Sequence, residues 1–135
     1  MRFAILLTSL LMLSACSSTE SNPAQVFANA FSMESPPSGV EVLHGYRLER
    51  RRFFVVSEQM YRLHLAGPNA IEFVREQWPD LEAATMRSFV QGSQTPWFAP
   101  GRDVKYVTLT SKSDPAVMVM LNPQSKDVFV AYDGL

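Results

Sequence analysis

The sequence has only one cysteine and two histidines, and these shortages exclude several kinds of chemistry. A single cysteine can form neither an intramolecular disulfide nor a zinc site built from several thiolates. The histidines, His44 and His64, fall on two neighbouring strand-like runs. A hairpin that turns near Arg51 would place His44 opposite about Glu58, so we expect no shared metal site. We therefore predict neither a metal nor a cofactor.

Strong net charge is also missing. The chain has 12 basic and 13 acidic residues, for a formal net charge of −1. A nearly neutral chain lacks the broad basic surface that binds nucleic acid. The sequence has no Gly-x-Ser-x-Gly turn and no glycine-rich phosphate loop. We expect the protein not to be an enzyme, although the sequence leaves open a hydrolase whose carboxylates meet only in the fold.

Long hydrophobic runs are absent as well. The longest, residues 3–13, is shorter than the ~20 residues that a membrane-spanning helix needs. It follows Met1 and Arg2 and ends in small residues, the pattern of a cleaved export signal. The tetrad Leu13-Ser14-Ala15-Cys16 resembles the lipobox of bacterial lipoproteins.

This resemblance implies that residues 1–15 are a signal peptide and that Cys16 becomes the lipidated first residue. Two or three acyl chains make such attachment effectively permanent. Lipoproteins retained in the inner membrane often carry aspartate after the lipidated cysteine, whereas this chain has Ser17. By the same resemblance, we expect a lipid anchor on the periplasmic face of the outer membrane.

Removal of residues 1–15 takes away one charged residue, Arg2, and leaves 120 residues with a net charge of about −2. A chain of this size forms one domain with an adequate core. We predict a lipidated tether over residues 16–38 and a globular domain over residues 39–135. The tether begins with polar residues 17–22 and includes a short helix with Asn22 as its cap and Pro23 in its first turn. Its apolar face must dock on the domain, on a partner or on the lipid surface, and the domain is the simplest choice.

The rest of the chain alternates between strand and helix patterns. Alternating apolar residues predict strands over 40–49 and 53–65, with a turn between them. Helical spacing predicts a helix over 69–78 and a second one that begins at Asp80 and ends at Gly92. Three strands follow, over 104–110, 116–121 and 128–132. The order ββααβββ predicts an α+β fold, with an antiparallel sheet of about five strands and helices packed on one face.

Two segments are candidate binding surfaces. Arg50, Arg51 and Arg52 lie at the predicted hairpin, and guanidinium groups match pairs of phosphate or carboxylate oxygens. They could bind anionic lipid headgroups or peptidoglycan carboxylates, or they could simply keep a turn soluble and protect strand edges.

The second candidate is the proline-rich loop over residues 95–102. Trp97, Phe98 and Arg102 have the side chains that anchor protein interfaces. Alternatively, Trp97 and Phe98 cover the end of the core.

Three segments resemble a group of small proteobacterial lipoproteins to which no activity is assigned. They are the Pro-Pro-x-x-Val-x-Val-Leu-His-x-Tyr segment at residues 36–46, the Trp97-Phe98 loop and the ending at residues 129–135. The resemblance implies the lipoprotein class and provides no catalytic residues.

We therefore expect a non-enzymatic binding or accessory module, held at the membrane through Cys16. Its partners would be an envelope protein or peptidoglycan, and not nucleic acid. An immunity lipoprotein that neutralises a periplasmic toxin is the alternative, and a cell-wall hydrolase is less favoured.

Overall fold

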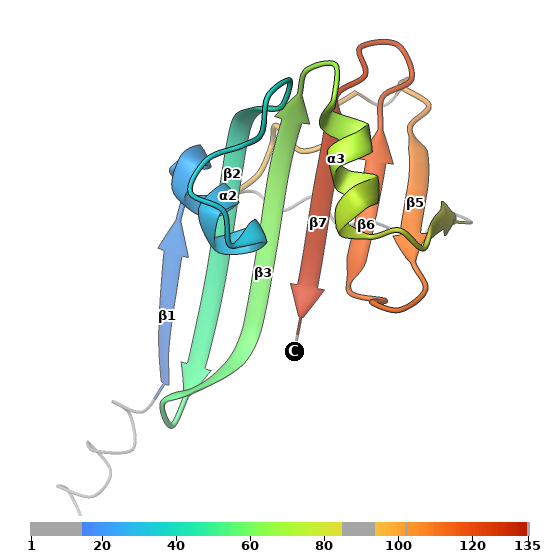
Figure 1. Cartoon of the computed structure of the whole chain (residues 1–135). Helices are drawn as coiled ribbons and strands as arrows, with labels where there is room; N and C mark the ends of the chain where they lie inside the picture. Colours follow the sequence, from blue (N-terminus) through green and yellow to red (C-terminus); the bar gives the residue numbers. More distant parts are fainter. Residues whose placement is uncertain (1–14, 85–93, 102, 135) are drawn as a thin grey trace, which may run out of the picture.

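The described residues form one antiparallel sheet of seven strands, with two helices on one of its faces (Figure 1). The computed structural model describes residues 15–84, 94–101 and 103–134. In chain order the elements are β1 (Ala15–Glu20), α2 (Pro23–Phe31), β2 (Glu41–Arg52), β3 (Val55–Ala66), α3 (Ala70–Gln77), β4 (Leu81–Ala83), β5 (Val107–Ser111), β6 (Val117–Leu121) and β7 (Val128–Gly134). The spatial order of the strands is β1-β2-β3-β7-β6-β5-β4.

The α+β class and the antiparallel sheet with helices on one face agree with the sequence prediction, but the number of strands is larger. One added strand is β1, which occupies the segment expected to be a polar tether. Its backbone pairs with β2 from Ala15 opposite Arg52 to Glu20 opposite Arg47. Polar side chains are compatible with an edge strand, because the backbone alone makes the ladder and the side chains can face solvent.

The other added strand, β4, replaces the start of the second predicted helix. The carboxylate of Asp80, expected to cap that helix, instead accepts hydrogen bonds from Ser111 Oγ at 2.8 Å and from the Ser113 backbone N–H at 2.6 Å. The hydrogen bonds from Ser113 and Ser111 lower the pKa of Asp80 to about 2. They fix Asp80 beside the β5–β6 connection, so that residues 81–83 pair with β5. The remainder of that predicted helix, including Gly92, lies outside the described residues.

The first two helices that the sequence predicts, in the tether and over residues 69–78, form as expected. Asn22 caps α2, with its side-chain oxygen accepting a hydrogen bond from the Gln25 backbone N–H at 3.2 Å, and Pro23 lies in the first turn. Val26 and Phe27 are fully buried, so α2 docks on the domain itself. Helix α3 lies within the predicted range and ends just before Pro79.

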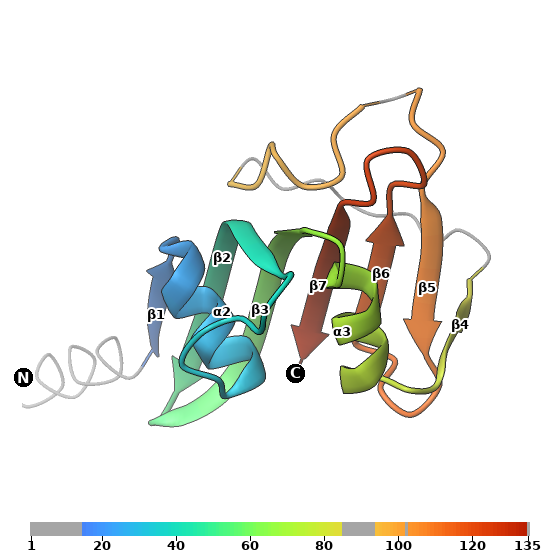
Figure 2. The same ribbon diagram turned by 45° about the horizontal axis from the view of Figure 1, so that its top comes forward.

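The sheet has an apolar side chain layer on each face. Both helices pack on one face, where Phe27, Phe31, Phe73 and Trp78 form a chain of ring contacts with centroids 4.9–5.8 Å apart. The other face is partly covered by the segment after residue 94, in which Phe98 packs on the β7 residue Phe129. Figure 2 shows the helices and this segment on opposite sides of the sheet.

The β2–β3 hairpin turns later than the sequence suggests. Its turn is Phe53–Phe54, which the sequence placed at the start of the second strand. As a result His44 pairs with His64, and the expected pairing of His44 with about Glu58 is wrong. The error has a physical source, since residues 46–66 contain no glycine, proline, asparagine or aspartate to mark a turn.

At Gly45, helix α2 packs closely against β2. A Cβ atom there would lie 2.9 Å from Val26 Cβ and 3.1 Å from Pro23 Cα. Because this contact involves backbone, we expect Gly45→Ala to lower the free energy of unfolding by about 1–3 kcal/mol. Urea unfolding measures the change, and Ser18→Ala at an exposed position of β1 serves as the control. Unchanged stability of Gly45→Ala would contradict the packing of α2 against β2.

Candidate functional site

Cys16 and the three consecutive arginines meet at one end of the sheet. In the β1–β2 ladder, Cys16 lies opposite Arg51, and its neighbours Ala15 and Ser17 lie opposite Arg52 and Arg50. Adjacent strands are about 4.8 Å apart, so these residues are direct neighbours. Cys16 is exposed and is a free thiol.

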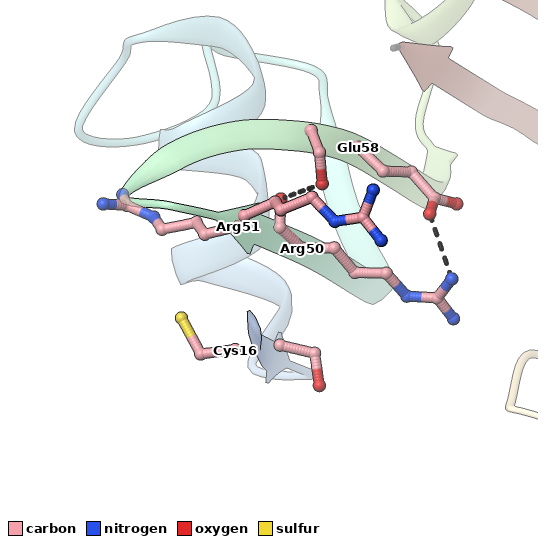
Figure 3. A pocket seen from close by; sticks show the side chains of 7 residues that line it. Cys16, Arg50, Arg51 and Glu58 are labelled. Carbon is pink, nitrogen blue, oxygen red and sulfur yellow. Dashed lines mark hydrogen bonds and ion pairs between the residues drawn. The ribbon is translucent and has the colours of Figure 1, made fainter. Parts of the chain in front are cut away.

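Figure 3 shows Cys16 beside this part of the hairpin, with Arg50 extending to Glu58. The residues surround a surface depression, which is lined by Cys16, Ser17, Arg50, Arg51, Arg52, Ser57 and Glu58. The sequence identified Cys16 and the arginines separately, and the structure brings them together.

An exposed apolar turn lies directly beyond the arginines. Phe53 is 60% exposed, Phe54 94%, Val55 68% and Val56 38%. We call residues 50–56 the hairpin tip. The sequence analysis did not predict that its apolar part is exposed, because a run of four apolar residues is typical of a buried strand. Residues 46–66 contain no glycine, proline, asparagine or aspartate that could have identified the turn.

The turn itself has an unusual composition. Phe53 and Phe54 both have positive φ, at 53° and 65°, as in the type I′ turns that usually contain Asn-Gly. The left-handed conformation costs about 1–2 kcal/mol for each residue with a Cβ. The exposed rings bury little surface to offset this cost. Phe53 and Phe54 therefore make the hairpin less stable than residues that favour the left-handed conformation would.

Charges at the hairpin are partly compensated. Glu49 is 4% exposed and pairs with Arg47 and Arg51, while Arg50 pairs with Glu58 at 3.1 Å. The hydrogen bond from Arg51 lowers the pKa of Glu49, and the same bond raises the pKa of Arg51. Both groups therefore stay ionised at neutral pH.

Residues 47–58 carry four arginines against two glutamates, an excess of two positive charges on a chain of net charge −1. Arg52 is exposed, and the described part of the chain provides it with no ion pair. The hairpin thus carries a local excess of positive charge, although the chain as a whole is slightly acidic.

The hairpin tip extends past β7, the strand that pairs with β3 on its other side. Of the β3 residues that pair with β7, Gln59 lies nearest to the tip, opposite Gly134. Beyond that point, among the residues that the structure describes, the hairpin has only β1 as a neighbouring strand. Figure 1 shows the tip protruding from the sheet at the end where β1 begins.

The second candidate surface, the aromatic loop, is largely built into the fold. Phe98 is fully buried, with its ring centroid 5.5 Å from that of Phe129 and the Arg62 guanidinium 5.7 Å from its ring. It covers the core and is not an exposed anchor. Trp97 is half-buried and stacks on His44, with centroids 5.1 Å apart. Arg102 lies outside the described residues.

The histidines that the sequence separated form a contact in the structure. His44 Nδ1 lies 3.0 Å from His64 Nδ1, and His64 Nε2 lies 3.0 Å from the Asp127 carboxylate. Burial, and then repulsion from His64, lower the pKa of His44. In the part of the chain that the structure describes, no cluster of three or more histidine, cysteine or acidic side chains could hold a metal.

The lowered pKa of His44 predicts a loss of stability in mild acid. The unfolded chain, with an ordinary pKa of 6.5, binds the proton more tightly than the folded protein. The free energy of unfolding should therefore decrease as the pH falls below 6.5. Urea unfolding at pH values of about 7.5 and 5.5 measures this decrease, and His44→Gln should reduce it. An equally steep decrease in His44→Gln would contradict the assignment to His44.

Comparisons of this chain with protein families, with curated proteins and with solved structures found no match. Among the described residues, no helix has the length and apolar character needed to cross a membrane.

The composition of the hairpin turn can be tested through stability. Replacing Phe53→Asn and Phe54→Gly together provides the residues that a type I′ turn favours, so the free energy of unfolding should rise by about 1–2 kcal/mol. Urea unfolding checks this expectation. If the double variant is less stable than the parent, the two rings contribute packing that their exposure does not indicate.

Proposed function

We propose that this protein is a lipoprotein, anchored through Cys16 to the periplasmic face of the outer membrane, where it acts as a non-enzymatic binding or accessory module. The observation that carries the proposal is the place of Cys16: an exposed thiol at the start of an edge strand, and the last residue of a lipobox-like tetrad.

The position of Cys16 suits acylation. Cleavage before Cys16 would shorten β1 by one residue, Ala15, and leave the remaining pairs of the ladder in place. Because the side chain is exposed, acyl groups on its sulfur would displace no packed residue. The three-dimensional fold is thus compatible with the modification that the tetrad implies.

Several polar side chains bind one another within the fold. Arg62 binds Asp133 through two hydrogen bonds of 2.8 and 3.1 Å. Asp80 binds the β5–β6 connection, and His64 binds Asp127. These pairs hold strands and turns to one another, so the role that they show is structural.

Lipidation can be tested by mass spectrometry of the protein purified from bacterial membranes. We expect a chain that begins at Cys16, with a diacylglyceryl thioether and an acylated amino group. Cys16→Ser should keep its leader and lose the lipid. An unmodified thiol in the native protein would contradict the proposal.

The membrane of residence can be tested with Ser17→Asp. Lipoproteins retained in the inner membrane often carry aspartate after the lipidated cysteine. The variant should therefore move from the outer-membrane to the inner-membrane fraction on a density gradient. The fold should tolerate the change, because position 17 is exposed and lies opposite Arg50. Ser18→Asp is the matched control and should stay with the outer membrane. Inner-membrane residence of the unchanged protein would contradict the proposed location.

A further inference from the structure

We infer that the hairpin tip is a second membrane contact, in which Phe53 and Phe54 enter the interface of an anionic phospholipid leaflet while Arg50, Arg51 and Arg52 lie at the level of its phosphates. This inference rests on the proposed function, because the lipid on Cys16 is what brings the tip to the bilayer.

The first argument is proximity. Cys16 pairs with Arg51, which is two residues from the turn. From the spacing of strands and of residues along a strand, the Cα atoms of Cys16 and Phe53 are about 8 Å apart. With the expected tether folded into β1, no flexible segment separates the lipidated residue from the sheet. A lipid on Cys16 would therefore hold the tip against the membrane surface.

The second argument is the order of side chains along the hairpin. The apolar residues are at the very end, and the arginines follow immediately behind them. Three residues of a strand span about 10 Å, which matches the 5–10 Å depth to which interfacial segments bury their apolar side chains. Rings and guanidinium groups thus lie at the depths that suit each of them.

The third argument is the distribution of the cations. Successive strand residues point to opposite faces, so Arg50 and Arg52 lie on one face of the hairpin and Arg51 on the other. Positive charge therefore flanks the apolar turn on both sides. This arrangement fits a hairpin that enters a negatively charged surface end-on.

The fourth argument concerns the turn residues. Two exposed phenylalanines with positive φ are unfavourable for the hairpin alone. Strained residues at an exposed site indicate a functional constraint. Burial of these rings in a lipid interface would provide the favourable contact that the folded chain lacks.

These observations favour lipid over peptidoglycan as the occupant. Peptidoglycan carboxylates could pair with the arginines, but they would leave Phe54 and its neighbours in water. A phospholipid leaflet satisfies both the charged and the apolar parts of the hairpin tip.

The insertion is tested with a tryptophan reporter in the lipidated full-length protein. Phe54→Trp places the reporter at the tip, and Leu43→Trp places a matched reporter at the opposite end of β2, at another exposed apolar position. Both proteins are reconstituted in vesicles of phosphatidylethanolamine and phosphatidylglycerol that contain nitroxide-labelled lipid. Emission of the parent protein, from Trp78 and Trp97, is subtracted.

We expect the Phe54→Trp emission to shift to shorter wavelength and to lose most of its intensity, with Leu43→Trp little changed. Equal, weak quenching of both reporters would overturn the inference and leave the lipid anchor unaffected.

A second arm examines the tip without the anchor. The Cys16→Ser chain, produced without residues 1–15 so that no apolar leader remains, should sediment with phosphatidylglycerol vesicles and not with phosphatidylcholine vesicles. Adding Phe53→Asn and Phe54→Gly should weaken binding about ten-fold. This variant retains a favourable turn, so unfolding would not explain the loss. Arg50→Gln with Arg52→Gln should also weaken binding, whereas Arg75→Gln with Lys126→Gln, the same change in charge elsewhere, should have a smaller effect.

The outcomes separate the two proposals. If native Cys16 proves to be unmodified but the Cys16→Ser chain still binds anionic vesicles through the tip, the proposed function fails and the membrane contact stands. If the tip variants leave vesicle binding unchanged, or if insoluble peptidoglycan retains the protein and vesicles do not, the inference fails.

Discussion

The pairing of β1 with β2 is the interaction on which the account of this protein depends. Without it, residues 16–20 would be a polar tether and Cys16 would have no defined place relative to the domain. With it, Cys16, the residue for which we propose acylation, lies opposite Arg51, beside the protruding end of the β2–β3 hairpin. A sequence feature and a structural feature, separated by some 35 positions in the chain, thereby form one surface.

The same pairing makes the two ends of the sheet chemically different. At one end of the sheet are Cys16, the arginines and the exposed phenylalanines. At the other end lie the connection between β3 and α3 and the turn between β6 and β7 (Figure 1). If the first end faces the membrane as we propose, the second end faces away from it. Loops at that far end would then be the part of the protein most accessible to an envelope partner.

Much of the fold follows from the sequence. Asn22 and Pro23 mark the start of α2, Pro79 follows α3, and alternating apolar residues identify the long strands. These features are predictable because each depends on local chemistry. The edge strands were missed for a physical reason: β1 is polar because its side chains face water, and Asp80 binds residues more than 30 positions away in place of capping a helix.

The candidate site was only partly predictable. The sequence identified Cys16 and the arginines, but a turn made of Phe53 and Phe54 has no turn-forming residue to reveal it, and their exposure depends on the hairpin outreaching β7. The most direct test of the central pairing is hydrogen exchange of the folded protein. The account predicts slow exchange at the β1 amides that pair with β2. Exchange of residues 16–20 at the rate of an unfolded chain would contradict it.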